Sequence, residues 1–348
     1  MKFIAEQSEL EDKLSKVSGA VATKDTMPIL KGVYISNELV LATDLEIGIK
    51  TSFECETENE GKAIFPSRIF SIVKELPDGE IEINVDENYK AELKCNGIEI
   101  ELDCYDAEEY PSMPEVEEPN IINVNSYQLE KAIQNTNNSV ASDEGQPALT
   151  GIYFDKNNTV STNTYRLAKF KNKIGFDDDF ILPSKAANEV ESLCQTVAEI
   201  DIEYSDNYVK FNFGDTTLFS RLIEGEFPNY NQVLPDKSNT KITIDSKDFK
   251  GCLKRAKTVD KEASIISLTT DNNSLNVILK SDTSQFEEVL KANVEGDNQT
   301  INLDIAYLLD GVKLVEGEKT EIELIDSLSP AVIKEEDLTY LVMPIRNN

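Results

Sequence analysis

A unit of roughly 120 residues recurs three times along this chain of 348 residues. Residues 3–17, 122–136 and 242–256 each read as a short alternating strand followed by two apolar residues four positions apart. This change of period predicts a strand and then an amphipathic helix. The apolar pairs are offset by 119 and 120 residues, and they are Leu10/Leu14, Leu129/Ile133 and Phe249/Leu253. The expected helix N-caps are Ser8, then Asn125 or Ser126, then Asp245 or Ser246.

Further segments repeat in the same order and at a similar spacing. Residues 27–35 match 146–154, and both contain a Pro, a Leu and a Gly at equal spacing. Expected second helices lie at 65–76, 182–193 and 302–312, and each is followed by a short alternating strand. The sequence therefore predicts an α+β protein of three repeated domains with mostly antiparallel sheets. Polar, Pro-containing connectors place these domains at 1–118, 121–237 and 241–348.

The composition removes several classes of chemistry. The chain has no His, which excludes Ser-His-Asp catalysis and the HExxH zinc site. Its five Cys residues are scattered and form no CxxC pair, so reduced thiols are expected. Residues 311–320 fail the P-loop spacing, and the acidic run 177–179 is expected to be a solvated turn. We therefore predict no catalytic residues, no metal site and no cofactor.

The net charge of −31 argues at first against a DNA partner, because phosphate binding needs Lys and Arg. The third repeat differs: residues 241–261 contain seven Lys or Arg and three Asp, a net charge of +4. The chain reaches Glu6 before any apolar stretch, and no apolar run approaches a membrane span. These features predict a cytoplasmic protein with no membrane partner.

Four segments resemble the bacterial β sliding clamps, the DNA polymerase III β subunits. They are LATDLEIGI (41–49), STNTYRLA (161–168), SRLIEGEFPNYNQVLP (220–235) and YLVMPIR (340–346). Together with MPILKGVYI (27–35), they match the family in order along the chain. The resemblance implies three clamp domains per chain and a head-to-tail homodimer that forms a ring. In that ring, helices line the hole and antiparallel sheets form the outside.

The resemblance also implies a function without catalysis. The ring would encircle double-stranded DNA without reading its sequence and tether the replicative DNA polymerase as a processivity factor. An ATP-driven clamp loader would open it, and other partners, including DNA repair proteins, would bind through a short peptide motif. Two alternatives come from the residues alone: a non-catalytic three-repeat structural or interaction protein, and a carboxylate-dependent hydrolase.

The resemblance carries over to particular residues. The peptide groove would be formed by Leu149, Thr162, Tyr165, Arg166, Leu167, Pro228, Val233, Leu328, Pro330, Met343 and Pro344. DNA would be faced by Lys24, Arg68, Lys74, Lys185, Lys250, Lys254 and Arg255, and the dimer contact would include Thr258 and Val259. Tyr165 stands where the family often has His, so the groove is expected to be reshaped. The simpler reading makes Leu149, Leu167 and Met343 ordinary core residues.

Overall fold

The structure is a computed structural model that describes residues 1–23, 27–143 and 145–346. Each repeat opens with a strand that runs directly into a helix, as the sequence predicts. These pairs are β1 (Lys2–Glu6) with α1 (Gln7–Val17), β10 (Asn120–Asn125) with α3 (Ser126–Gln134), and β18 (Thr240–Asp245) with α5 (Ser246–Val259). The second helices are α2 (Arg68–Glu75), α4 (Ser184–Cys194) and α6 (Ile305–Leu314), at the three expected places.

The helix starts agree with the sequence in two of three repeats. The Asp245 carboxylate accepts hydrogen bonds from the backbone N–H groups of Lys247 and Asp248, which makes Asp245 the N-cap of α5. Asn125 accepts one from the Gln128 N–H at 3.3 Å. The prediction for Ser8 is wrong, because α1 begins one residue earlier, at Gln7, and Glu6 makes no side-chain cap.

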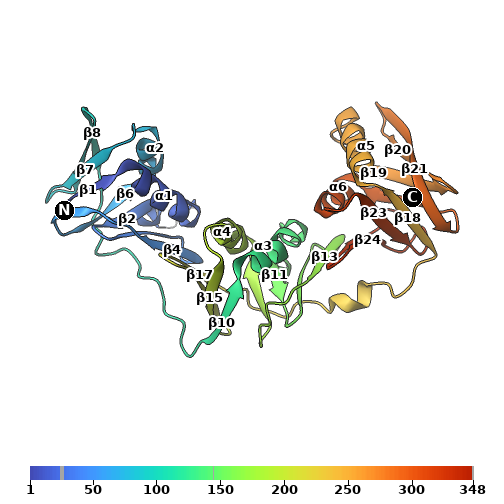
Figure 1. The fold of residues 1–348 in the computed structure, drawn as a ribbon, viewed down its shortest axis with the longest axis horizontal. Coiled ribbons are helices and arrows are strands. Elements are labelled where there is room, and N and C mark those ends of the chain that lie inside the picture. Colours follow the sequence, from blue (N-terminus) through green and yellow to red (C-terminus); the bar gives the residue numbers. More distant parts are fainter. Residues whose placement is uncertain (24–26, 144, 347–348) are drawn as a thin grey trace. The chain divides into compact units, whose positions relative to one another are not determined.

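The described residues form two compact units, residues 1–130 with 185–222 and residues 131–184 with 223–348. The first unit has a five-stranded sheet and an eight-stranded sheet, and α1 packs against α2 (Figure 1). The five-stranded order is β5 (Glu56–Asn59), β1, β7 (Glu80–Val85), β8 (Lys90–Cys95), β9 (Ile98–Asp103). The eight-stranded order is β10, β15 (Glu199–Tyr204), β16 (Tyr208–Phe213), β17 (Thr216–Arg221), β4 (Ile47–Ser52), β3 (Leu39–Thr43), β2 (Gly32–Ser36), β6 (Lys62–Pro66).

The second unit has one twelve-stranded sheet. Its order is β14 (Phe180–Pro183), β11 (Gly151–Phe154), β12 (Asn158–Thr162), β13 (Arg166–Lys171), β25 (Leu338–Val342), β24 (Ala331–Glu335), β23 (Lys319–Leu324), β18, β21 (Gln285–Gly296), β20 (Ser274–Lys280), β19 (Ile265–Asp271), β22 (Thr300–Asp304). Short 3₁₀ turns, η2 (Pro28–Lys31), η4 (Pro147–Leu149) and η5 (Tyr230–Val233), complete the elements used below.

The middle repeat contributes strands to both units. Strand β17 pairs antiparallel with β4 of the first repeat, and β13 pairs antiparallel with β25 of the third. Because these sheets continue from one repeat into the next, each compact unit combines part of the middle repeat with a neighbouring repeat. The domain limits 1–118, 121–237 and 241–348 therefore stay predictions.

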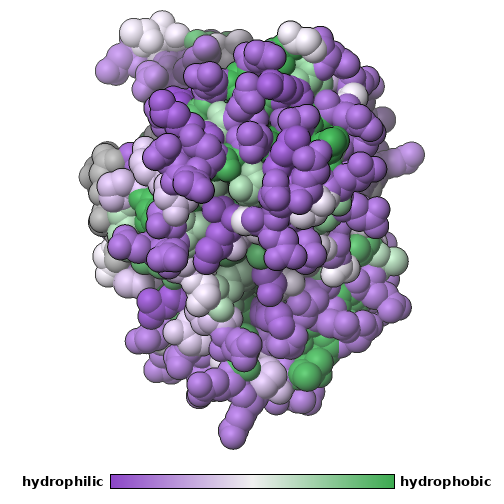
Figure 2. All heavy atoms as spheres, turned by 90° about the vertical axis from the view of Figure 1, so that its left-hand side faces the viewer, coloured by the Kyte–Doolittle hydropathy of each residue, from purple (hydrophilic) through white to green (hydrophobic). Residues whose placement is uncertain are grey.

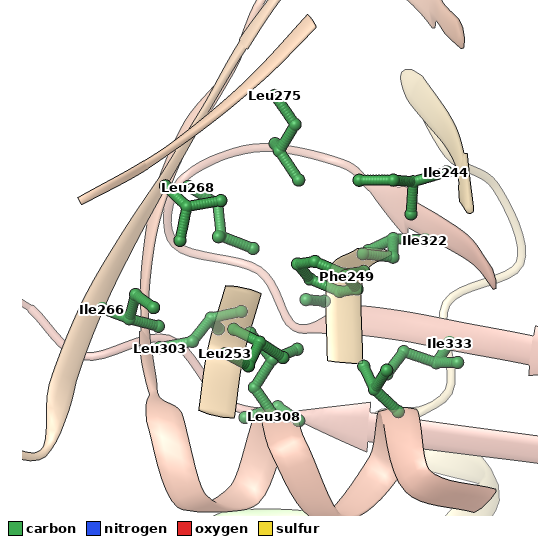
Figure 3. Packing of buried hydrophobic residues seen from close by; sticks show 14 of the residues in the cluster. Ile244, Phe249, Leu253, Ile266, Leu268, Leu275, Leu303, Leu308, Ile322 and Ile333 are labelled. Atoms are coloured by element: carbon green, nitrogen blue, oxygen red, sulfur yellow. The ribbon is translucent and has the colours of Figure 1, made fainter. Parts of the chain in front are cut away.

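The third repeat shows how the periodic apolar residues build a core. Phe249 and Leu253 of α5 and Leu308 of α6 point toward the same interior, and all three are completely buried (Figure 3). Residues from the surrounding strands close it, including Ile244, Ile266, Leu268, Leu275, Leu303, Ile322 and Ile333 (Figure 3). The i, i+4 pair that predicts the helix is thus the pair that packs against the sheets.

Figure 2 shows one face covered mostly by hydrophilic residues, with small scattered hydrophobic areas between them. Among the described residues, no helix has the length and apolar composition that crossing a bilayer requires.

Candidate functional site

The β13–β25 junction joins the second and third repeats. Arg166 pairs with Val342 and Leu167 with Leu341, and the Met343 N–H donates to the Tyr165 carbonyl at 2.8 Å. This register places Met343, the residue after β25, beside the turn that precedes β13. Residues 165–167 and 341–343 therefore lie side by side although about 175 positions separate them. Of these, the sequence predicts Tyr165, Arg166, Leu167 and Met343 to line one groove.

A tight turn between β12 and β13 fixes the start of β13. The Asn163 side chain accepts hydrogen bonds from the N–H groups of Tyr165 and Arg166, at 3.1 and 3.0 Å. The Thr162 hydroxyl donates to the Arg166 carbonyl at 2.7 Å and accepts from the Thr164 N–H at 3.1 Å. Thr164 has φ 73°, a left-handed conformation unusual for a β-branched residue. The turn leaves the Tyr165 residue 64% exposed.

A cluster of apolar side chains, here called the second-repeat cluster, lies at this junction. Its buried members are Leu149, Val160, Leu167, Ile181, Phe227, Tyr230 and Leu341, and Met343, Tyr153, Ala141, Ala148, Ile223 and Leu234 pack against them partly buried. Leu149 and Leu167 are only 4% and 3% exposed, so they belong to the buried part of this cluster. Met343, Val233 and Tyr165 reach solvent.

Ten of the thirteen residues of this cluster were missed from the sequence, among them Tyr153, Phe227, Tyr230 and Leu341. Tyr153 and Phe227 stack with ring centroids 4.8 Å apart. The Tyr230 hydroxyl donates to Asp155 at 2.6 Å, and the Tyr153 hydroxyl donates to Asp179 at 2.6 Å. Burial and these carboxylates raise the pKa of both tyrosines. The aromatic residues flanking Pro228 were the available signal, because buried aromatic rings dominate contact surfaces.

Arg166 is placed differently from the other predicted groove residues. Its guanidinium donates to Asp310 of α6 at 2.8 Å and to the Asn138 carbonyl, and it lies over the Tyr307 ring at 4.5 Å. The side chain is 11% exposed. Its buried Nε has no hydrogen-bond partner among the described residues. Arg166 therefore ties the start of β13 to α6, and its charge is already paired.

The remaining groove residues lie at the margin. Thr162 is buried within the turn, Pro228 is exposed, and Pro330 and Pro344 are partly buried. Leu328 is 63% exposed on a turn in which the Asp326 carboxylate accepts from the Leu328 and Ser329 N–H groups. Pro344 forms an isolated bridge with Leu303. The structure thus unites Leu149, Leu167 and Met343 in one cluster, while contact of Pro228, Leu328 and Pro330 with that cluster stays a prediction.

The predicted DNA-facing residues divide into two groups. Arg68 and Lys74 on α2 and Lys254 on α5 are exposed. Lys250 donates to the Val315 carbonyl at 2.5 Å, Lys185 pairs with Asp44, and Arg255 pairs with Glu288 through two hydrogen bonds of 2.5 and 3.0 Å. Lys24 lies outside the described residues. Two of these cations, Lys185 and Arg255, therefore already have carboxylate partners.

The helices nevertheless differ in charge from the rest of the chain. The six α-helices in the described part of the chain contain twelve Lys or Arg and nine Asp or Glu, a net charge of +3. The whole chain has −31, so all other segments together carry −34. Cationic charge is concentrated on helices and anionic charge on strands and loops. Within the ranges that the structure covers, no group of His, Cys, Asp and Glu has a metal-binding arrangement.

Comparison with known proteins gives the same assignment along the whole chain. Residues 1–114, 123–229 and 231–346 match the N-terminal, central and C-terminal domain families of the DNA polymerase III beta subunit. A "Beta sliding clamp" of Staphylococcus epidermidis is 29% identical, with 99% of each sequence covered. The DNA polymerase III beta subunit of Thermotoga maritima superposes with a TM-score of 0.93 at 26% identity, with all of both chains covered.

A third relative was solved with a ligand. The sliding clamp of Bartonella birtlesii bound to griselimycin has a TM-score of 0.93 and 26% identity, again with full coverage of both chains. The matched families span nearly every residue, in the order of the three repeats. The chain therefore belongs to the DNA polymerase III beta subunit family, the sliding clamps that serve DNA replication as non-catalytic processivity factors.

Proposed function

We propose that two copies of this chain close head to tail into a ring around duplex DNA. The observation that carries this proposal is that neighbouring repeats are joined by the same kind of strand pairing, while two equivalent strands lack such a partner in the described residues. β4 pairs with β17, and β13 pairs with β25, so one strand of each repeat joins the last strand of the next. In the third repeat the strand equivalent to β4 and β13 is β21. In the first repeat the strand equivalent to β17 and β25 is β9. In the described residues β9 is an edge strand, and residues 285–291 of β21 pair with β20 alone.

Pairing β21 of one copy with β9 of the other would remove both edges at once. The side chains along these edges suit such burial. Ile98 on β9 is 41% exposed, Val289 on β21 is 63% exposed, and Val259, next to Thr258 at the end of α5, is 46% exposed. Large apolar side chains exposed at both edges favour an interface. Both edges also carry carboxylates, including Glu99 and Glu287, so self-association should tighten as salt screens their repulsion.

The DNA is held loosely by cations on the helices. Arg68, Lys74, Lys250 and Lys254 would contact phosphates without reading bases, with Lys24, Lys185 and Arg255 as further contacts. Topology, rather than tight binding, then keeps the ring on the duplex. The acidic remainder of the chain repels DNA from other surfaces. Because a closed ring cannot thread onto circular DNA, a separate ATP-driven loader would open it, in the cytoplasm.

The replicative polymerase, the loader and repair proteins would bind the second-repeat cluster through a short apolar peptide. Leu149 and Leu167, which are buried, would form the floor, and the more exposed Met343, Val233 and Tyr165 would form an adaptable rim. Thr162, Arg166, Pro228, Leu328, Pro330 and Pro344 would surround them. The griselimycin-bound relative supports ligand binding by a protein of this fold. Arg166 would act by holding β13, since its charge is paired with Asp310.

Peptide binding tests the rim directly. A fluorescein-labelled peptide with the clamp-binding C-terminus of a polymerase is titrated with wild-type protein, Met343→Ala and the control Met27→Ala. Removing a partly buried anchor should cost about 1–3 kcal/mol, or roughly tenfold or more in affinity. Met27 is 39% exposed and lies outside the cluster, so its variant should bind like wild type. Equal affinity for all three proteins would contradict the proposed site.

Ring closure is tested by measuring the molar mass of the protein in solution. The chain is 38.9 kDa, so light scattering should give about twice that value for the wild-type dimer. Val289→Lys and Ile98→Lys place charges on the proposed edges and should shift the mass to that of one chain. Ile121→Lys is a matched control, because Ile121 is 71% exposed on β10 and not on either edge. A dimer that withstands both edge substitutions contradicts β9–β21 pairing.

A further inference from the structure

The first repeat contains a second copy of the apolar cluster. This first-repeat cluster consists of buried Leu30, Leu41, Ile64, Ala107 and Tyr110, with Ala22, Ile29, Tyr34 and Met113 packed against it. Five of its members stand 119 positions before members of the second-repeat cluster: Ala22/Ala141, Ile29/Ala148, Leu30/Leu149, Tyr34/Tyr153 and Leu41/Val160. Tyr110 precedes Tyr230 by 120. The apolar cluster beneath the proposed peptide site is thus largely present twice.

The turn beside the cluster is also duplicated, bond for bond. Asp44 accepts from the N–H groups of Glu46 and Ile47, both at 2.9 Å, as Asn163 does in the second repeat. Leu45 has φ 77° where Thr164 has 73°. The Arg221 N–H donates to the Glu46 carbonyl at 2.9 Å, as the Met343 N–H donates to that of Tyr165. Backbone geometry therefore cannot distinguish the two clusters as binding sites.

Two substitutions change the junction side of the first-repeat cluster. Through the shared register, Gly48 occupies the place of Leu167, and Arg221 occupies the place of Met343. The apolar floor residue and the apolar rim residue are both missing there. A gap in the wall would be left at Gly48 unless another side chain covered it.

Met113 covers that gap. A Cβ placed on Gly48 would lie 3.4 Å from Met113 Cγ and 3.5 Å from Met113 Cε, so the Met side chain rests on the glycine. Met113 belongs to the connector after Tyr110, and its counterpart 120 positions later is Val233. Val233 is 46% exposed, whereas Met113 packs against the cluster. An unbranched Met is long and flexible enough to fill such a gap.

We infer that the first repeat carries a closed counterpart of the peptide site, in which the chain's own connector, through Met113, fills the place of the missing Leu167 side chain and closes the cluster against a partner peptide. The inference rests on the proposed peptide site of the second repeat. It explains why one chain would bind a partner at one junction although it builds two. Met113 is then a specificity residue that excludes an apolar peptide from the first repeat.

The test truncates Met113 in a protein whose second-repeat site is already weakened. The labelled polymerase peptide is titrated with Met343→Ala and with Met343→Ala carrying Met113→Ala. The variant with both Met343→Ala and Met113→Ala should bind at least tenfold tighter than Met343→Ala alone. Met343→Ala carrying Met27→Ala is the control and should bind as weakly as Met343→Ala alone. A double variant that binds no better than this control overturns the inference, while failure of wild-type protein to bind overturns the proposed function instead.

A second measurement needs no partner. The chain has four Met residues, so methyl-labelled methionine gives a spectrum with a separate signal for Met113. The inference requires a Met113 methyl shifted by the neighbouring Tyr rings and insensitive to added peptide, while the Met343 methyl shifts on titration. A Met113 methyl with the chemical shift of an unstructured chain would overturn the inferred packing of Met113 on Gly48.

Discussion

The β4–β17 and β13–β25 junctions have the same backbone but are fastened by different side chains. Both use a Thr-Asx turn with one left-handed residue, and both continue a sheet from one repeat into the next. At β4–β17, Lys13 of α1 reaches Asp215 in the β16–β17 turn, and Lys185 of α4 reaches Asp44. The cations come from helices and the anions from turns.

At β13–β25 the arrangement is reversed. The cation, Arg166, lies on the strand, and the anion, Asp310, lies on a helix. The Arg166 guanidinium also lies over the Tyr307 ring, and a Lys would lack the planar group that Arg offers an aromatic face. The repeat thus supplies the junction, while individual side chains differ in how they hold each one. The following predictions alter one junction at a time.

Arg166→Ala should have the largest effect. It leaves Asp310 without its Arg partner and removes the stacking on Tyr307, at a cost of about 3 kcal/mol in the free energy of unfolding. Hydrogen exchange should accelerate at the β13 and β25 amides before it does at β4 and β17. Lys171→Ala, at the exposed end of β13, is the matched control. A loss below about 1 kcal/mol, typical of a surface ion pair, would show that the pair does not fasten the junction.

Asp215→Asn and Lys13→Met should differ, although they break one ion pair. The Lys13 side chain is 8% exposed, while that of Asp215 is 40% exposed. Removing the carboxylate leaves a buried ammonium with Glu9 at 3.4 Å, which should cost about 1–2 kcal/mol. Removing the Lys leaves a carboxylate that water can reach, so the cost should stay below about 1 kcal/mol. Urea denaturation of both variants measures the order, and the reverse order would contradict this account.

Much of the fold could be predicted because its signals are local. The alternating strands and i, i+4 pairs can be recognised within segments of fifteen residues, and Asp245 lies directly before α5, at the N-cap position. The prediction of Ser8 as an N-cap is wrong because α1 begins at Gln7. The Gln7 side-chain amide donates a hydrogen bond to the Val73 carbonyl at 2.7 Å. That contact joins residues 66 positions apart, so no local pattern contains it.

The candidate site was predictable only in part, for the same reason. Leu149, Leu167 and Met343 converge as the family resemblance implies. The engagement of Arg166 by Asp310, 144 positions away, and of Lys185 by Asp44, 141 positions away, depends on sheet pairing. The sequence shows that these two residues are cationic, but it does not show that each has a carboxylate partner in the fold. Met113 escaped notice because its role depends on Gly48 lying beneath it.

Acid should act on the β4–β17 junction through Asp215. Burial by itself would raise the pKa of this carboxyl, but hydrogen bonds from Lys13 and Thr216 and the charge of Lys16 lower it below the ordinary value. A carboxyl with a lowered folded pKa contributes stability above its unfolded pKa, about 3.9, and loses it as pH falls through the folded pKa. The gap in unfolding free energy between wild type and Asp215→Asn should therefore shrink from pH 5 to pH 3. A constant gap would contradict this linkage.

The smallest expected effect compares the two left-handed turn residues. Gly adopts a positive φ without a Cβ clash, so Leu45→Gly and Thr164→Gly should each relieve backbone strain. The gain is partly cancelled by the greater freedom of Gly in the unfolded chain, which leaves a net of about 0.5 kcal/mol. Thr164→Gly should gain more, because a β-branched residue tolerates this region least. Thermal denaturation of both variants checks the order. If Leu45→Gly gains more instead, side-chain contacts of the turn, rather than backbone strain, distinguish the two junctions.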